Sequence, residues 1–170
     1  ATAVALLLGA GSTTWTLTIL IRPMTDDFGS SHVQLLGALT VAGILGALSA
    51  PVIGRIADRY GSRAILVTSL VFLGLTLILT SRIQALWQFY LVYGVGTGLS
   101  QSGITRVGSQ AVAANWFIRK RGIAFATLAF PVAIAGVVFA PLAQAIVDWS
   151  DWRMVWMVLG LAILALPVPL

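Results

Sequence analysis

The chain has 170 residues, of which 59% are hydrophobic and only 9% are charged, and its mean hydropathy is +0.99. A soluble domain holds roughly 45–50% apolar and 25% charged residues. A water-soluble fold of this size is excluded, because it has too little polar surface to cover so much apolar surface. The sequence also contains 17 Gly, six Trp and no Glu. This composition predicts an α-helical protein whose solvent is lipid.

The net charge of +5 does not indicate a nucleic-acid partner, because the basic residues fall in short gaps between apolar runs. The absence of Cys excludes disulfides and thiolate metal sites, and His32 alone cannot form a metal site. We therefore predict no cofactor. Both ends lie inside apolar runs, and no basic region precedes the first one. We expect a fragment of a longer protein without a cleavable signal peptide.

A helix needs about 20 apolar residues to cross a bilayer core of about 30 Å. The chain supplies this length repeatedly, which predicts an all-α, polytopic membrane bundle. The first span is expected to end before Arg22 and Pro23, and Ser31 with Gln34 predicts a capping box at the start of the second. The predicted spans are residues 1–21, 33–53, 64–80, 85–114, 122–147 and 152–170.

The gaps between these spans alternate in charge. Those after the second and fourth spans hold six basic residues and one acid, whereas the other three hold three basic residues and four acids. The basic residues of the first group are Arg55, Arg59, Arg63, Arg119, Lys120 and Arg121. Short cytoplasmic loops hold the excess of Lys and Arg. The pattern predicts a multi-pass protein of the cell inner (plasma) membrane with a cytoplasmic amino terminus.

Small residues recur at every fourth position on the second and fourth spans. They are Ala38, Ala42, Gly46, Ala50 and Gly54 on one, and Gly94, Gly98 and Ser102 on the other. Membrane helices associate largely through close backbone approach at such stripes. We therefore expect both helices to pack against protein. Pro51, Pro131 and Pro141 permit kinks in the second and fifth spans.

The segment 54–63 combines two glycines with one acid among several arginines. Gly54 and Gly61 permit a tight reversal, and Asp58 is suited to bond a guanidinium or a helix amino terminus. The simpler alternative is a charged loop whose arginines only reflect the excess of Lys and Arg in cytoplasmic loops. The spacing resembles the loop motif between the second and third helices of the major facilitator superfamily. That resemblance implies a conformational latch formed by Gly54, Asp58, Arg59, Gly61, Arg63, Arg119 and Arg121.

Other segments resemble the same family: residues 115–124, Asp151-Trp152-Arg153 with Gly160, and residues 89–98, which are similar to the monocarboxylate porter branch. The resemblance implies the amino-terminal half of a twelve-helix secondary transporter, with a missing carboxy-terminal half as partner. It implies symport or antiport of a small solute, such as an organic anion, by alternating access. The fifth span lacks the Gly-Pro with paired Gly typical of many antiporters, which argues against drug-proton antiport.

Arg106 is the first candidate for contact with the solute. It lies within the fourth apolar span, four residues after Ser102 and eight after Gly98, so the three share a helix face. In the family, the first and fourth helices line the central cavity, where an Arg would meet an anionic group. The alternative is that Arg106 extends to the cytoplasmic interface or pairs with another side chain.

Further cavity candidates are Thr14 and Trp15 on the first span, and Tyr90, Tyr93 and Gln101 on the fourth. The alternatives are hydroxyls bonded to their own backbone and, for Tyr90, a place in the interfacial aromatic belt. We find no nucleophile with a base and no metal ligands at helical spacing, so no enzyme is predicted. Nor does an Asp, Glu or His lie in mid-span to carry a proton. A non-transporting sensor or assembly subunit on the same fold remains the alternative.

Overall fold

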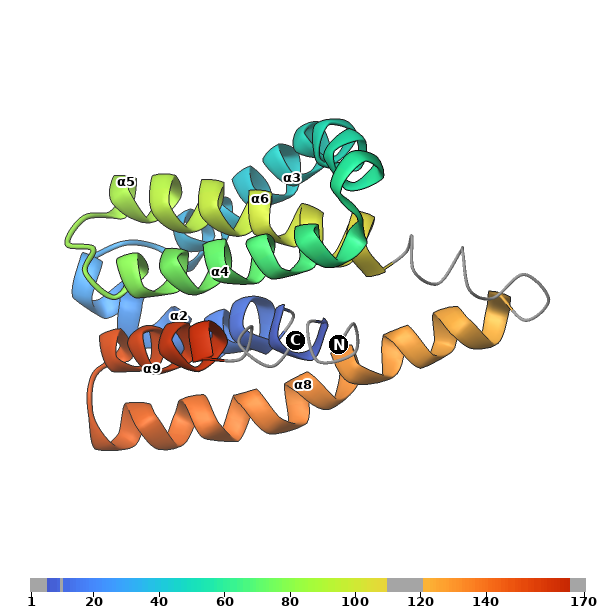
Figure 1. Cartoon of the computed structure of the whole chain (residues 1–170). Coiled ribbons are helices and arrows are strands. Elements are labelled where there is room, and N and C mark those ends of the chain that lie inside the picture. Colours follow the sequence, from blue (N-terminus) through green and yellow to red (C-terminus); the bar gives the residue numbers. More distant parts are fainter. Residues whose placement is uncertain (1–5, 10, 110–120, 166–170) are drawn as a thin grey trace.

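The computed structural model describes residues 6–9, 11–109 and 121–165, with side chains for 6–9, 11–105 and 130–165. All regular structure in these ranges is helical, and the helical segments run alongside one another as a bundle (Figure 1). The predicted all-α membrane bundle is thereby confirmed. Connections at residues 29–31, 81–85 and 150–151 lie at one end of this bundle, and Gly61 lies at the other, which we call the Gly61 end.

The first helix comprises residues 6–9, the π-helix η1 (Gly11–Trp15) and α2 (Thr16–Phe28). The predicted end at residue 21 is wrong, because Pro23 lies inside α2 and the helix continues past it. A proline removes one backbone hydrogen bond without stopping a helix whose other bonds are made. The helix ends at Gly29, which adopts a left-handed conformation with φ of 58°.

The second and third helices are α3 (His32–Tyr60) and α4 (Ser62–Thr80). The predicted capping box is confirmed: the Gln34 amide donates to Ser31 Oγ at 3.3 Å, and the Ser31 amide donates to Gln34 Oε1 at 2.9 Å. The expected gap at residues 54–63 is wrong, because only Gly61, with φ of 86°, separates the two helices. Charged residues mark where the apolar span ends, but they do not interrupt backbone hydrogen bonding.

The fourth helix is built from α5 (Leu86–Phe89), η2 (Tyr90–Val95), α6 (Gly96–Gln101) and η3 (Ser102–Ser109), where η2 and η3 are π-helical. The rest of the predicted span 85–114 lies outside the described residues. The last two helices are α8 (Arg121–Trp149), which contains Pro131 and Pro141, and α9 (Trp152–Ala165).

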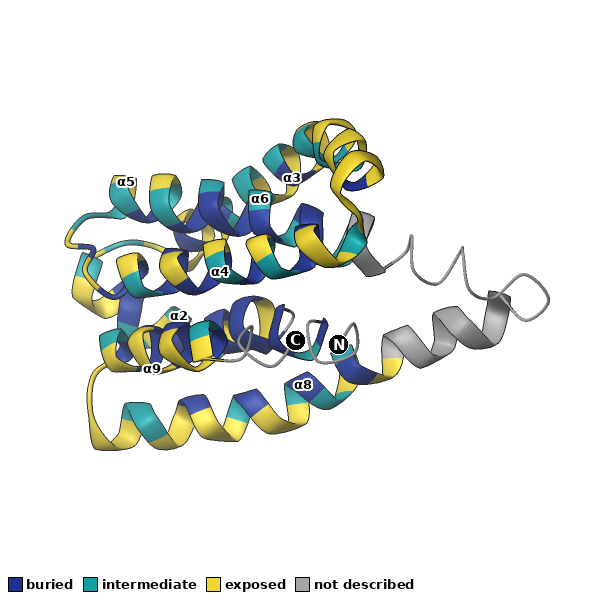
Figure 2. Cartoon of the chain, viewed as in Figure 1, coloured by how far each residue is buried: buried dark blue, intermediate teal, exposed yellow. Residues whose placement is uncertain are grey.

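Three described segments are long and apolar enough to cross a membrane by themselves: His32–Tyr60, Ser62–Thr80 and Phe130–Trp149. The first and fourth helices are divided into shorter pieces by π-helical turns, and α9 reaches the limit of the described residues. Large apolar side chains are exposed on the outside of the bundle, as along α8, where Val137 is 77% exposed (Figure 2). Such a surface suits contact with lipid tails.

The predicted stripes of small residues bring α3 and the fourth helix into backbone contact. A Cβ added at Gly98 would lie 2.6 Å from the Ala42 carbonyl oxygen, and one at Gly46 would lie 3.0 Å from the Gly98 oxygen. A Cβ added at Gly54 would meet no atom of the described residues within 4 Å, so the close approach does not extend to the end of α3. A second close crossing joins α4 and α9, where a Cβ at Gly160 would lie 2.8 Å from the Gly74 oxygen.

Candidate functional site

A cavity of about 300 Å³ lies between the first helix, α3, the fourth helix and α8. Hydroxyl and amide side chains line it together with aliphatic groups and bare backbone. Its lining residues are Leu6, Thr13, Thr14, Leu39, Ala42, Gly43, Gly46, Tyr93, Thr97, Gly98, Gln101, Ser102, Thr105 and Val132. The close crossing at Gly46 and Gly98 forms one wall, where backbone replaces side chains. No charged side chain lines the cavity within the part of the chain whose side chains are described.

The π-helical segments supply much of the polar lining. Thr13 and Thr14 belong to η1, Tyr93 belongs to η2, and Ser102 and Thr105 belong to η3. A π-helical turn inserts a residue into the helix and redirects the side chains around it, and such turns are frequent at functional sites. This local geometry turns short polar side chains of two neighbouring helices toward one space.

Gln101 connects the first helix to the fourth at the edge of this cavity. Its Nε2 donates to the Gly9 carbonyl oxygen and to Thr13 Oγ1, both at 2.8 Å, and its Oε1 accepts from Thr105 Oγ1 at 2.8 Å. The hydroxyl of buried Tyr93 donates to the Thr13 carbonyl oxygen at 3.1 Å. These bonds hold the two helices in one register.

Three of the residues predicted from sequence line the cavity: Thr14, Tyr93 and Gln101. Trp15 does not line it. Its ring packs against Gly136 of α8, because a Cβ added at Gly136 would lie 3.1 Å from the Trp15 ring. Tyr90 lies outside it as well, and its hydroxyl donates to the Gln34 carbonyl oxygen at the start of α3. Arg106 follows Ser102 by four residues in η3, and its side chain lies outside the description.

Sequence reasoning missed four polar lining residues: Thr13, Thr97, Ser102 and Thr105. Thr97 and Thr105 lie four residues before and after Gln101, so they share its helix face. That spacing was the available signal for these two residues. Ser102 lies four residues after Gly98, which also lines the cavity, so the same spacing was available for Ser102. Thr13 belongs to the π-helical segment η1, whose geometry the helical period does not indicate.

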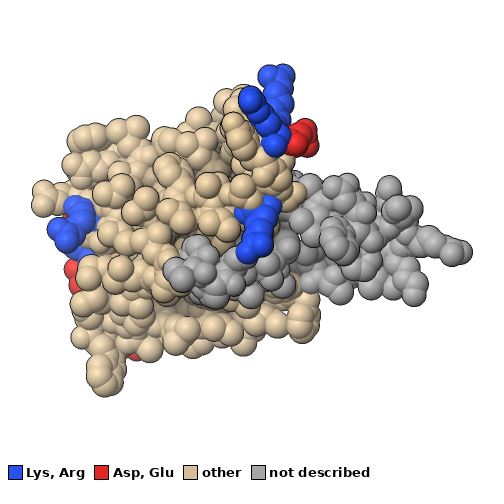
Figure 3. Space-filling view, in the orientation of Figure 1, with Lys and Arg blue, Asp and Glu red and all other residues tan. Residues whose placement is uncertain are grey.

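The described residues of the predicted latch lie at the Gly61 end. Asp58 and Arg59 are exposed in the last turn of α3, and Arg63 is exposed in the first turn of α4. Asp58 forms no ion pair with any residue that the structure describes, and the Arg59 guanidinium lies 5.5 Å from the centre of the Tyr60 ring. Figure 3 shows basic side chains near both ends of the visible face. Arg119 and the Arg121 side chain lie outside the described residues.

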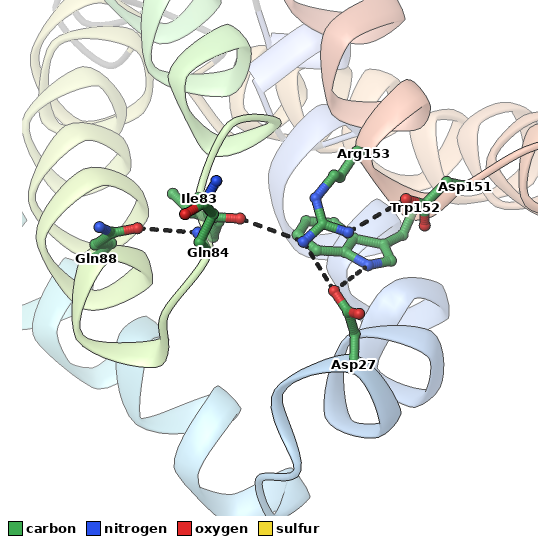
Figure 4. Close-up of polar contacts among 7 residues, drawn as sticks. All are labelled: Asp27, Ile83, Gln84, Gln88, Asp151, Trp152 and Arg153. Atoms are coloured by element: carbon green, nitrogen blue, oxygen red, sulfur yellow. Dashed lines mark hydrogen bonds and ion pairs between the residues drawn. The ribbon is translucent and has the colours of Figure 1, made fainter.

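The opposite end carries a polar cluster that joins the end of α2, the connection at residues 81–85 and the start of α9 (Figure 4). Arg153 Nη2 lies 2.8 Å from Asp27 Oδ2 and donates to the Ile83 carbonyl oxygen at 3.4 Å. Trp152 Nε1 donates to the same Asp27 oxygen at 3.3 Å, and Arg153 also pairs with Asp151 at 3.2 Å. The motif at the start of α9 was apparent from sequence, whereas its partner Asp27 was not.

The family model of the Major Facilitator Superfamily matches residues 2–170, almost the whole chain. The chain belongs to the Major Facilitator Superfamily. Proteins of this superfamily are multi-pass membrane proteins, in agreement with the apolar bundle described above. No group of three or more His, Cys, Asp or Glu side chains that could hold a metal ion occurs in the described part of the chain.

Several transporters are similar to this chain. The Fujikurins efflux protein of Gibberella fujikuroi is 27% identical over 85% of this chain and 31% of its own length. The Chloramphenicol resistance protein CraA of Acinetobacter baumannii is 28% identical over 86% of this chain and 36% of its own length. The MFS transporter asaE of Aspergillus flavus is 31% identical over 66% of this chain and 27% of its own length. The chain therefore spans about a third of these relatives, and the matches do not single out the monocarboxylate porter branch.

Proposed function

We propose that the whole protein is a secondary active transporter of the inner (plasma) membrane, and that this chain forms its amino-terminal half. A small organic solute would bind in the cavity while the two halves rock around it in alternating access. The observation that carries this proposal is the cavity of about 300 Å³, bordered by helices of a superfamily bundle and lined by both hydroxyl and aliphatic groups. This combination suits a small organic molecule with a few polar atoms.

The solute class that we propose is an organic anion, such as a monocarboxylate, with Arg106 as the group that binds its charge. Arg106 lies in η3 one turn beyond Ser102, in an apolar helix where a charged side chain is costly unless it has a partner. Uptake of labelled lactate and benzoate into proteoliposomes that contain the full-length protein tests this directly. Chloramphenicol serves as the uncharged comparison, because one relative is named for resistance to it.

Arg106→Ala should lower anion uptake by at least about tenfold, and Arg106→Lys should retain part of it. Arg22→Ala is the matched control, because Arg22 is an exposed cation in the middle of α2 and does not line the cavity. Equal uptake by the unaltered protein, Arg106→Ala and Arg22→Ala would exclude Arg106 from the site. Uptake of chloramphenicol without uptake of either anion would contradict the proposed solute class and indicate an uncharged solute.

We further propose that Asp58 and the surrounding arginines form a latch with the carboxy-terminal half at a cytoplasmic Gly61 end. In support, Asp58 is exposed and has no ion-pair partner among the described residues. Asp58→Asn should shift the two-state balance and raise the labelling rate of a cysteine introduced on the cytoplasmic side of the cavity. Asp148→Asn is the control, because Asp148 lies in the last turn of α8, at the end of the bundle opposite the Gly61 end. Identical labelling of both variants would count against the latch.

The alternative function is a non-transporting sensor or assembly subunit on the same fold. Binding of a solute without any uptake, under imposed proton and ion gradients of either direction, would support that alternative. The direction of solute movement relative to each imposed gradient also distinguishes symport from antiport. The efflux and resistance names of the relatives make export the first direction to measure.

A further inference from the structure

Arg82 is a charged side chain without a partner, just beyond the end of an apolar helix. It follows Thr80, the last residue of α4, by two positions, at the end of the bundle that carries the Asp27–Arg153 pair. The side chain is exposed, and its guanidinium forms no hydrogen bond or ion pair with any residue that the structure describes. Arg153, in contrast, pairs with two carboxylates in the same region. The charge of Arg82 can therefore be met by an anionic group that approaches from outside the bundle.

Two grooves on the outside of the bundle meet at Arg82. The first has a volume of about 300 Å³ and lies between the end of α4 and the start of the fourth helix, where Trp87 and Leu91 are among its lining residues. The second has a volume of about 220 Å³ and lies between the end of α4 and the start of α9, where Met154 and Met157 are among its lining residues. Arg82 lines both grooves, so one cation stands between two apolar surfaces.

The grooves are placed where lipid headgroups give way to acyl chains. Their apolar side chains are open to the surroundings: Trp87 is 64% and Leu91 is 57% exposed, and both methionines of the second groove are also exposed. Tryptophan favours the interface between headgroups and chains. Arg82 directly follows Ser62–Thr80, a helix long and apolar enough to cross a membrane. Its guanidinium should thus lie at the level of the headgroups, with the grooves extending toward the membrane core.

This face of the bundle lies away from the candidate transport cavity. That cavity is lined by the first helix, α3, the fourth helix and α8, whereas α4 and α9 contribute none of its described lining. A carboxy-terminal half that closes around the cavity would contact the helices that line it, which leaves the α4–α9 face to lipid. Asp151 also borders the second groove, but its carboxylate pairs with Arg153 at 3.2 Å, which weakens its repulsion of an anion.

We propose that Arg82 binds the phosphate of a membrane phospholipid whose two acyl chains occupy the two grooves. The planar guanidinium presents donors that match the geometry of phosphate oxygens. A diacyl phospholipid has one phosphate above two chains, and the protein presents one unpaired cation between two apolar grooves. The site does not depend on which solute is transported, or on whether transport occurs.

The test is a titration of the purified full-length protein in detergent, with bound lipid measured by native mass spectrometry. The probes are dioleoylphosphatidylglycerol and dioleoylglycerol, which have the same chains but differ in the phosphate headgroup. Arg82→Gln should weaken binding of the phospholipid by about fivefold and leave binding of dioleoylglycerol unchanged. Arg82→Lys should retain part of the difference. Arg22→Gln is the control, because Arg22 is an exposed arginine on α2 that lines neither groove.

The grooves are tested by filling them. Leu91→Trp in the first groove and Met157→Trp in the second should each weaken binding of both lipids, because each removes space for one chain. Leu75→Trp, at an exposed position of α4 outside both grooves, should not. Monooleoylphosphatidylglycerol, with one chain, should bind the unaltered protein more weakly than the two-chain lipid.

Equal affinity of the unaltered protein and Arg82→Gln for the phospholipid would overturn the proposal, as would unchanged affinity in either groove variant. A lower unfolding temperature of Arg82→Gln without any change in lipid affinity would also overturn it, since it would show that Arg82 pairs with another part of the protein.

Discussion

Gly98 offers a decisive test of how the cavity wall is built. Its Cα faces the backbone of α3, and a Cβ added there would lie 2.6 Å from the Ala42 carbonyl oxygen and 3.1 Å from the Ala42 Cα. Because ordinary contact begins at 3.4 Å, Gly98→Ala forces the two backbones apart by roughly 0.8 Å at this point. The neighbour is backbone in mid-helix, so no side-chain rotation relieves the contact.

The magnitude follows from comparison with Gly43→Ala. Gly43 also lines the cavity from within a long helix, but no atom of the described residues lies within 4 Å of a Cβ added there. Both substitutions gain up to about 1 kcal/mol from helix propensity. Only Gly98→Ala also incurs overpacking, which typically costs about 1–3 kcal/mol. The difference in unfolding free energy between the two variants should therefore be about 1–3 kcal/mol, with Gly98→Ala the less stable.

The assay is thermal unfolding of the full-length protein in detergent, followed by the fraction that remains monodisperse after heating. Gly98→Ala should unfold at a lower temperature than Gly43→Ala, and its solute affinity should also change because the cavity wall moves. Equal unfolding temperatures for the two variants would refute the reasoning, since they would show that α3 and the fourth helix do not meet at Gly98.

Three further predictions use the same unfolding assay. Gln101→Ala removes the bonds between the first and fourth helices and should cost about 1–3 kcal/mol, whereas Gln144→Ala, at an exposed position on α8, should stay within about 0.5 kcal/mol; equal effects would contradict the bridging role. Ser31→Ala removes the side-chain cap of α3 and should cost about 1 kcal/mol, so an unchanged unfolding temperature would show that the cap contributes nothing. Asp27→Asn should cost at most about 1 kcal/mol and less in high salt, because Asp27 and Arg153 are 42% and 34% exposed; a salt-independent loss would mean that the pair is shielded from solvent.

Interactions between residues that lie close together in the sequence could be predicted without knowledge of the fold. Ser31 and Gln34 form the expected capping box because both partners lie within one helical turn. Helix ends were less predictable, because polarity reports where the apolar span stops, whereas the backbone continues through Pro23 and through Asp58. Gly29 and Gly61, the two glycines with positive φ in the described part of the chain, mark where two of these helices end.

The sequence by itself determined the membrane class, the alternation of charge between successive connections and the stripes of small residues. These properties depend on composition and on the helical period, which neighbouring residues share. The tertiary structure alone decided that Gly98 meets Ala42, that Asp27 meets Arg153, and that Arg82 borders two grooves. Each of these depends on how helices distant in sequence are rotated against one another, and a π-helical turn changes that rotation without a recognisable signal in the residue pattern.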